Sequence, residues 1–339
     1  MTVTVKDVAK KAGVSPSTVS RVINDHPSIS VETKKKIRHI MDDMGYFPNV
    51  TARNLGKQRA NSLGLILPPL DSNDRIGNPL YLELINAVNE SAREFRVTTA
   101  VASAKTAEEL LENVIRMHRQ KQVDGFILTY SEKEDPIAHY LYENNVPFTL
   151  IGRPAEKEAE IIYVDNDNQL LGKQATEFLL EKGHKNILFA SNVNQQIIFF
   201  ERYFGYQEAL MLANLPTHQA ITLTQPEDYA AFPEIIEETQ ATALVVIDDI
   251  FALRIIQLAN LYGYQVPDDL SIISFNNSIF ATLVHPYLTT IDIDISDLGR
   301  LGTQKLMEQI EKQPSNGVQL VVPHQLIQRE TVIENPKKH

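Results

Sequence analysis

The sequence predicts a small all-α head with a helix-turn-helix, followed by an α/β body of two doubly wound parallel-sheet lobes. The first sixty residues are basic and hold three short apolar stripes at helical spacing. From residue 62 onward, nearly continuous apolar runs alternate with helix-like runs, which is typical of a parallel sheet covered on both faces. These units are too many for one ordinary sheet, and 339 residues suffice for two or three domains.

Charge is divided unevenly along the chain. The net charge is −11, yet residues 1–60 hold 11 Lys and Arg against 5 Asp and Glu, and the remainder holds 21 against 38. A basic module on an acidic body indicates that the first segment alone meets a polyanion. The alternative is a solvated basic tail, but such a tail would lack helical periodicity.

Several classes of protein are disfavoured. The chain has no cysteine, which excludes disulfides and thiolate metal sites. Its start lacks the apolar run of a signal peptide, and no apolar run approaches the roughly 20 residues that span a bilayer. The motifs G-x-x-x-x-G-K-[ST], G-x-G-x-x-G, H-E-x-x-H and G-x-S-x-G are absent, and the nine histidines show no metal-ligand spacing. We therefore expect a cytoplasmic protein that is not an enzyme, binds no metal or cofactor and contacts no membrane.

Start and stop residues mark three helices in the head. Thr4 begins a capping-box pattern, and Gly13 suits the left-handed position that ends the first helix. Ser15 is a candidate N-cap of the second helix, with Pro16 at its first position. Ser30 is the candidate cap of the third helix. A tight turn between the first two helices indicates a helix-turn-helix unit.

The second helix, within VSPSTVSRVIND, divides its residues between two faces. Val19, Val22 and Ile23 form a stripe that would hold it against its neighbours. Small hydroxyl residues and Arg21 lie on the other face, where they suit contacts to phosphates and base edges in the major groove. The predicted DNA contacts are Thr4 at the start of the first helix and, in this stretch, Ser15, Pro16, Ser17, Thr18, Ser20, Arg21 and Asn24. The alternative is a three-helix bundle whose polar face meets only solvent.

Five motifs follow one another in the head: D-V-A, A-G-V-S, T-V-S-R-V-I-N, G-Y-x-P-N and A-R-N-L. Together they closely resemble the head of the lactose/galactose-repressor family, and the resemblance extends through the whole chain. It implies a DNA-binding domain at 1–48 and a hinge helix and linker at 49–60. A hinge leucine of this family wedges into the minor groove, which implies this role for Leu55 and adjoining contacts for Asn49, Ala52 and Arg53. The alternative is that Leu55 is an ordinary linker residue.

The body, residues 61–339, resembles the family's effector-binding and dimerisation domain, which has the architecture of periplasmic binding proteins. We expect an N-lobe at about 61–160 plus 291–322 and a C-lobe at about 161–290 plus 323–339. The chain would therefore divide near Glu160 and return near Thr290. The strand-like runs are SLGLIL, VTTAVA, DGFILT, PFTLI, IIYV, NILFA, ALVVI and LSIISF.

Polar or aromatic residues follow many of these strands. Ligands of open parallel sheets bind outside the carboxyl ends of the strands, so these side chains are candidates for binding a polyhydroxylated ligand. Those positions hold Asp71, Tyr130, Arg153, Asp165, Asp248 and Asn276. Each has a simpler alternative: Tyr130 could pack between lobes and Arg153 could be a surface charge. A strand-end aspartate often caps the next helix, which we favour for Asp249 and leave open for Asp165.

The resemblance singles out three positions. ERYFGY matches an R-x-x-G-Y/W motif whose arginine clasps ligand hydroxyls, here Arg202. Phe199 lies nearby and could stack on a sugar ring, or pack beneath its helix. DDIFALR marks Asp248, although Arg254 stands where glycine is usual. SFNN places Asn276 where aspartate is frequent, which removes a charge from the site.

The segments FNNS, GRP at 152–154 and NPLY at 78–81 are most similar to maltose-operon repressors within the family, and they add Tyr81 to the predicted effector contacts. The resemblance implies a homodimer that binds operator DNA and is released by a small sugar, with maltose as the expected effector. One alternative is a catabolite-control regulator activated by a phosphoprotein corepressor. Others are a sugar-binding protein and a sugar-modifying enzyme.

Overall fold

The computed structural model describes residues 3–23, 25–46, 59–70, 78–193, 196–311 and 317–335. The chain forms two compact units, Met1–Ala60 and Asn61–His339, called here the head and the body. Within the described residues, no helix is long and apolar enough to cross a bilayer.

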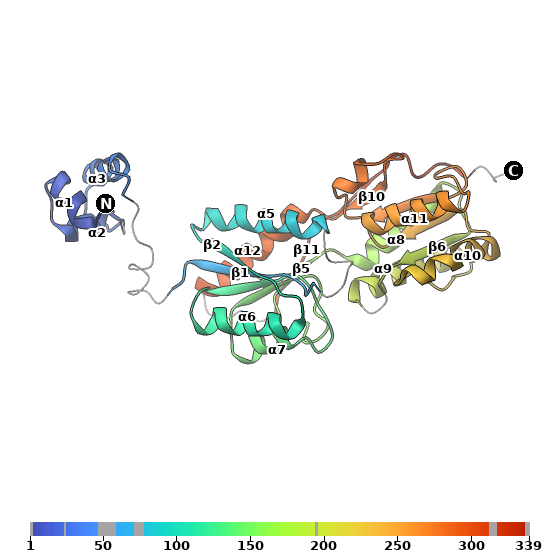
Figure 1. Ribbon diagram of the computed structural model, residues 1–339, viewed down its shortest axis with the longest axis horizontal. Helices are drawn as coiled ribbons and strands as arrows, with labels where there is room; N and C mark the ends of the chain where they lie inside the picture. The colour runs from blue at the N-terminus through green and yellow to red at the C-terminus, as the bar shows by residue number, and fades with distance from the viewer. Residues whose placement is uncertain are drawn as a thin grey trace. The chain divides into compact units, whose positions relative to one another are not determined.

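Within its described residues, the head contains three helices, α1 (Val5–Ala12), α2 (Pro16–Ile23) and α3 (Val31–Asp43), which are blue in Figure 1. Their apolar faces meet in one core formed by Val8, Ala9, Ala12, Val19, Val22, Ile37, Met41 and Tyr46.

The predicted helix ends of the head are confirmed. The Asp7 carboxylate accepts hydrogen bonds from the Thr4 N–H (2.9 Å) and hydroxyl (2.6 Å). Gly13 ends α1 with φ 71°, and Ser30 accepts from the Thr33 N–H at the start of α3. These caps fix both ends of α1 and the start of α3.

The N-lobe of the body has a six-stranded parallel sheet in the order β11-β5-β4-β3-β1-β2. Helices α5 and α12 cover one face and α6 and α7 the other (Figure 1). The strands are β1 (Ser62–Ile66), β2 (Thr98–Ala102), β3 (Gly125–Leu128), β4 (Phe148–Ile151), β5 (Tyr163–Asp165) and β11 (Gln319–Val321). The helices are α5 (Pro79–Glu94), α6 (Ala107–Arg119), α7 (Pro136–Glu143) and α12 (Ile295–Glu311).

The C-lobe repeats this plan, with the order β12-β10-β9-β8-β6-β7 and only β12 antiparallel. Its strands are β6 (Ile187–Ser191), β7 (Ile221–Thr222), β8 (Ala243–Val246), β9 (Ser271–Phe275), β10 (Thr289–Asp292) and β12 (Gln325–Ile327). Its helices are α8 (Asn168–Glu181), α9 (Ile197–Leu212), α10 (Phe232–Thr239) and α11 (Asp249–Leu261), with 3₁₀ turns η1 (Pro226–Ala231) and η2 (Ile279–Thr282). Helices α8 and α9 cross at two glycines, Gly172 and Gly205, where any side chain would meet the other helix's backbone.

The points at which the chain passes between lobes differ from those predicted. Strand β5 pairs with β4 and β11, so the first passage follows Asp165 and not Glu160. Strand β10 pairs with β9, so the second passage follows Asp292 and not Thr290. The apolar run IIYV fits either sheet equally well, and only its pairing with distant strands decides which one. A third passage lies between β11 and β12. The amide of Asn166, in the first passage, donates to the carbonyls of Ile293 in the second and Val322 in the third, each at 3.0 Å, and so joins all three.

Candidate functional site

Helix α2 presents a polar face to solvent. Ser15, Pro16, Ser17, Ser20 and Arg21 are exposed, whereas Val19 and Val22 are fully buried. The hydroxyls form a local network at the start of the helix, in which the Ser15 oxygen lies 2.7 Å from that of Ser17. Short hydroxyls and an exposed guanidinium are groups that contact phosphates and base edges.

Two of the predicted DNA contacts are less accessible. Thr18 is half-buried and its hydroxyl lies 2.9 Å from that of Ser15. The Thr4 hydroxyl is exposed but already donates to Asp7. Some predicted contacts lie outside the described residues, namely Asn24, Asn49, Ala52, Arg53 and Leu55, together with the predicted effector contact Asp71.

A cavity of about 330 Å³ lies between the two lobes of the body. This volume falls within the range of small-molecule sites, roughly 300–1,000 Å³. Residues from both lobes line it, and they include most of the predicted effector contacts: Tyr81, Tyr130, Arg153, Asp165, Arg202, Asp248 and Asn276. The sequence had separated these residues by up to two hundred positions, and the strand ends bring them together.

Arg202 lies on the wall of the cavity with only 1% of its surface exposed. Its Nε donates to the Asn168 side-chain oxygen (3.0 Å), and its Nη1 donates to the Ile247 carbonyl (2.6 Å). The guanidinium also lies 4.3 Å from the centre of the Phe275 ring. Burial lowers the pKa of Arg202 to about 10, so the group remains a cation at neutral pH.

Three aspartates surround this cation and differ in their roles. Burial raises the pKa of Asp165 to about 7, and the Asn168 amide donates to both of its oxygens at 3.2 Å. Asp248 is the N-cap of α11, where its Oδ1 accepts from the Phe251 N–H (2.7 Å). A carboxylate that caps a helix can still offer its other oxygen to a ligand.

Our interpretation of Asp249 as a helix cap is wrong. Asp249 is buried and accepts hydrogen bonds from the Ser274 hydroxyl (2.6 Å), the Thr290 hydroxyl (2.8 Å) and the Ser278 N–H (2.6 Å). The first residue of the pair Asp248-Asp249 caps the helix instead, so the second points into the C-lobe. Helix α8 is likewise capped by Asp167, which leaves Asp165 on the cavity wall.

Arg153 joins the two lobes. Its Nη1 donates to Glu201 of α9 at 2.7 Å, and its Nη2 donates to Glu158 of the N-lobe at 3.0 Å. The two carboxylates raise the pKa of Arg153 above its usual value, whereas burial raises the pKa of Glu201. The side chain predicted to contact the effector is therefore already held by two carboxylates.

Phe199 is not brought to the cavity. Its side chain is 7% exposed and stacks on Tyr203 with a ring separation of 5.7 Å, inside the C-lobe core. It is not among the residues that line the cavity, whereas Ile198, Glu201 and Arg202 of the same helix are. Asn276 does line the cavity, on a backbone with φ 102°.

Sequence reasoning also missed polar lining residues. They are Asn78, Thr129, Ser131, Glu132, Asn166, Asn168, Asn192, Gln196 and Glu201. A signal for one of them was present, because Glu201 directly precedes the motif arginine. Asn168 and Gln196 lie at or beside helix starts, where polar residues are too common to be diagnostic.

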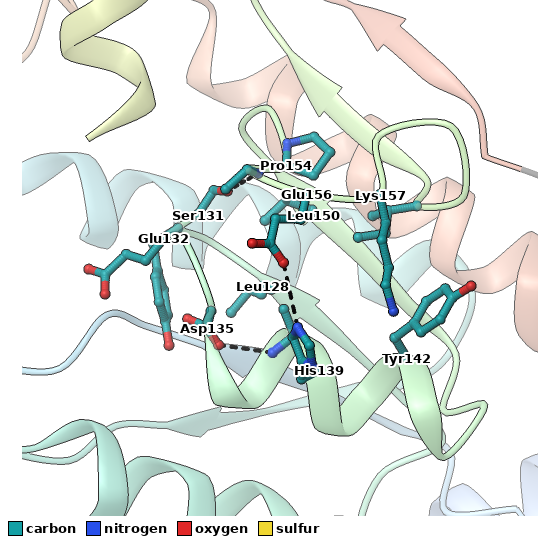
Figure 2. A pocket seen from close by; sticks show the side chains of 14 residues that line it. Leu128, Ser131, Glu132, Asp135, His139, Tyr142, Leu150, Pro154, Glu156 and Lys157 are labelled. Carbon is teal, nitrogen blue, oxygen red and sulfur yellow. Dashed lines mark hydrogen bonds and ion pairs between the residues drawn. The ribbon is translucent and has the colours of Figure 1, made fainter. Parts of the chain in front are cut away.

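A second cavity of about 30 Å³ lies beside the first, within the N-lobe (Figure 2). It shares Tyr130, Ser131 and Glu132 with the large cavity. The Ser131 hydroxyl accepts from the Ala155 N–H, and His139 lies 3.5 Å from Glu156. This volume holds one or two waters, so the cavity is too small for a sugar. Among the described residues, no group of acidic and histidine side chains is arranged to hold a metal ion.

Two family models match this chain, one in the head and one in the body. Residues 4–49 match the model "Bacterial regulatory proteins, lacI family", and residues 176–332 match "Periplasmic binding protein-like domain". The HTH-type transcriptional regulator MalR of Streptococcus pneumoniae serotype 4 is 30% identical, with 97% of this chain and 100% of that protein covered.

Two further similarities cover the head and the body together. Catabolite control protein A of Priestia megaterium is 29% identical, with 96% of this chain and 98% of that protein covered. The structure of a transcriptional regulator CelR–cellobiose complex has a TM-score of 0.73 and 27% identity, and covers 97% of this chain and 100% of that one.

Proposed function

Since this chain belongs to the lacI family of bacterial regulatory proteins, whose members are not enzymes, we propose that it is a sugar-responsive transcriptional repressor in the cytoplasm. Its head binds operator DNA, and a sugar bound between the two lobes releases it. The observation that carries the proposal is the cavity of about 330 Å³ whose polar lining comes from both lobes. A ligand in such a place favours the lobe arrangement that it binds better.

The effector we propose is maltose or a related oligosaccharide. The CelR–cellobiose complex supports a disaccharide effector, and the similarity of FNNS, GRP at 152–154 and NPLY at 78–81 to maltose-operon repressors favours maltose. Carboxylates, amides and Arg202 supply the acceptors and donors that sugar hydroxyls need, and Tyr81 and Tyr130 supply aromatic faces.

We propose that the working form is a homodimer whose two heads bind the half-sites of a near-palindromic operator. Each α2 enters the major groove with Ser15, Pro16, Ser17 and Arg21 towards the bases, and Leu55 of the hinge segment enters the minor groove. Exposed apolar side chains on the body support self-association, among them Leu82 of α5 and Ile279 and Leu283 near η2.

The experiment selects binding sites from a random DNA pool with the full chain, and then measures binding of the selected duplex with a panel of sugars. We expect a near-palindromic site and weaker binding with maltose or a related sugar. A chain that selects no site, or whose binding no sugar changes, would contradict the proposal.

A second candidate is a catabolite-control regulator, supported by the 29% identity to catabolite control protein A. A phosphoprotein corepressor would strengthen operator binding, whereas an inducing sugar would weaken it. Titration of the operator complex with a phosphorylated phosphocarrier protein separates the two candidates, because the operator affinity would rise in one case and stay unchanged in the other.

A further inference from the structure

We propose that the cavity accepts an uncharged sugar and rejects phosphorylated or carboxylated sugars, and that Glu201 enforces this choice by occupying Arg153. This inference rests on the proposed function and names the chemical class of its effector.

The first argument is the balance of charge on the cavity wall. Its charged lining residues among those described are four acids and two arginines: Glu132, Asp165, Glu201 and Asp248, with Arg153 and Arg202. Even when Asp165, whose pKa is about 7, is protonated, an entering phosphate meets three carboxylates and two guanidinium groups. Unpaired like charges brought together in a poorly solvated site disfavour binding.

The second argument is that both cations are engaged. Arg153 is held by Glu201 at 2.7 Å and Glu158 at 3.0 Å, so its two terminal nitrogens already donate to carboxylates. Arg202 donates through Nε and Nη1 to Asn168 and Ile247, so each pair of neighbouring nitrogens that could grip a phosphate includes one that already donates to the protein. A phosphate is bound well by a fork of two parallel donors, and on both arginines every such fork includes a nitrogen that is already engaged. A single donor suffices for a sugar hydroxyl.

Glu201 is the residue on which this choice depends. It comes from α9 in the C-lobe, whereas Arg153 and Glu158 belong to the N-lobe, so the Arg153–Glu201 ion pair forms across the cavity. The Glu201 side chain is 15% exposed and that of Arg153 is 45% exposed. Without the Glu201 carboxylate, Nη1 of Arg153 can donate to a ligand in the cavity.

The test compares the full-length wild type with Glu201→Gln, which keeps the shape and removes the charge. Calorimetry measures the binding of maltose, maltose 6′-phosphate and inorganic phosphate. We expect the wild type to bind maltose at least about 30-fold more tightly than its phosphate ester, and Glu201→Gln to narrow this ratio at least about tenfold. Glu208→Gln is the matched control, because Glu208 lies on the same helix, pairs with Lys173 and does not line the cavity.

A second substitution at Arg153 should reverse the effect of Glu201→Gln. Adding Arg153→Ala to Glu201→Gln should abolish the gained affinity for the phosphate ester, because the freed guanidinium is then absent. A gain that persists without Arg153 would overturn the assignment, as would a wild type that binds the phosphate ester as tightly as maltose.

The proposed function can fail separately. If no sugar binds the wild type, the sugar-sensing proposal fails, and inorganic phosphate still tests the inference. The charge argument then predicts Arg153-dependent phosphate binding in Glu201→Gln and none in the cavity of the wild type. Wild-type phosphate binding that Arg153→Ala removes would overturn it.

Discussion

The polar face of α2 and the wall of the inter-lobe cavity are both built for polar partners, but in opposite ways. On α2 the side chains are exposed, and Arg21 makes no ion pair or hydrogen bond through its guanidinium to any residue that the structure describes. In the cavity, Arg202 is 1% exposed and Arg153 is held by two carboxylates. An unpaired surface cation suits a polyanion, whereas paired and buried charges suit a neutral ligand that exchanges single hydrogen bonds.

Replacement of Arg202 should show the largest effect, because it removes the buried cation from beside Asp165 and Asp248. We expect Arg202→Met to lower the free energy of unfolding by about 3–5 kcal/mol and to abolish measurable sugar binding. Urea unfolding and calorimetry measure the two effects. An Arg202→Met protein that keeps wild-type sugar affinity would show that the sugar does not bind in this cavity.

Asp165 should make the stability of the body depend on pH. Its pKa is about 7 in the folded chain and 3.8 when unperturbed, so between these values the folded state binds more protons than the unfolded state. Stability contributed by this group is therefore greatest below the lower value and falls as pH rises towards 7, by up to about 4 kcal/mol.

Asp165→Asn isolates that contribution, because the amide keeps an acceptor for Asn168 and does not ionise. The difference in unfolding free energy between Asp165→Asn and the wild type should grow as the pH rises from 4 to 8. A difference that stays constant over this range would contradict the raised pKa.

Arg21 should have an intermediate effect, confined to the head. Loss of one bidentate base contact weakens the binding free energy by about 1–3 kcal/mol, or the affinity by roughly fivefold to 150-fold. We expect Arg21→Ala to weaken binding to the selected operator and to relax its sequence preference without changing sugar affinity. Arg38→Ala is the matched control, since Arg38 lies on α3 and is paired with Asp25. Equal losses of sequence preference in both variants would show that Arg21 supplies only charge.

Ser17 should show the smallest effect. Its hydroxyl is exposed and lies 2.7 Å from that of Ser15, so Ser17→Ala removes one neutral hydrogen-bonding group. We expect operator binding to weaken by about 0.5–1.5 kcal/mol, with sugar affinity and unfolding unchanged. Fluorescence anisotropy of a labelled operator duplex measures the operator affinity. Stronger binding by the alanine variant would show that Ser17 does not contact the DNA.

The same contrast explains what the sequence could predict. The caps of the head are contacts between close neighbours, such as Thr4 and Asp7 three residues apart, so residue patterns were enough to place its helices. The cavity depends on contacts over long separations, such as Arg153 with Glu201 across 48 positions and Asp249 with Thr290 across 41.

Strand-end reasoning therefore located the wall of the cavity but not the partners of its charges. It could tell neither that Asp248 rather than Asp249 caps α11, nor that Phe199 turns into the core. Both outcomes depend on which way a helix is rotated on its sheet, and packing between distant segments decides that rotation.

The most direct test of the account follows operator release and sugar binding in one preparation of the full-length chain. Labelled operator is titrated with maltose and followed by anisotropy, while calorimetry measures occupancy of the cavity by maltose in the same operator complex. The account predicts that release and occupancy reach their midpoints at the same sugar concentration. Full occupancy with no loss of operator, or release without binding in the cavity, would contradict it.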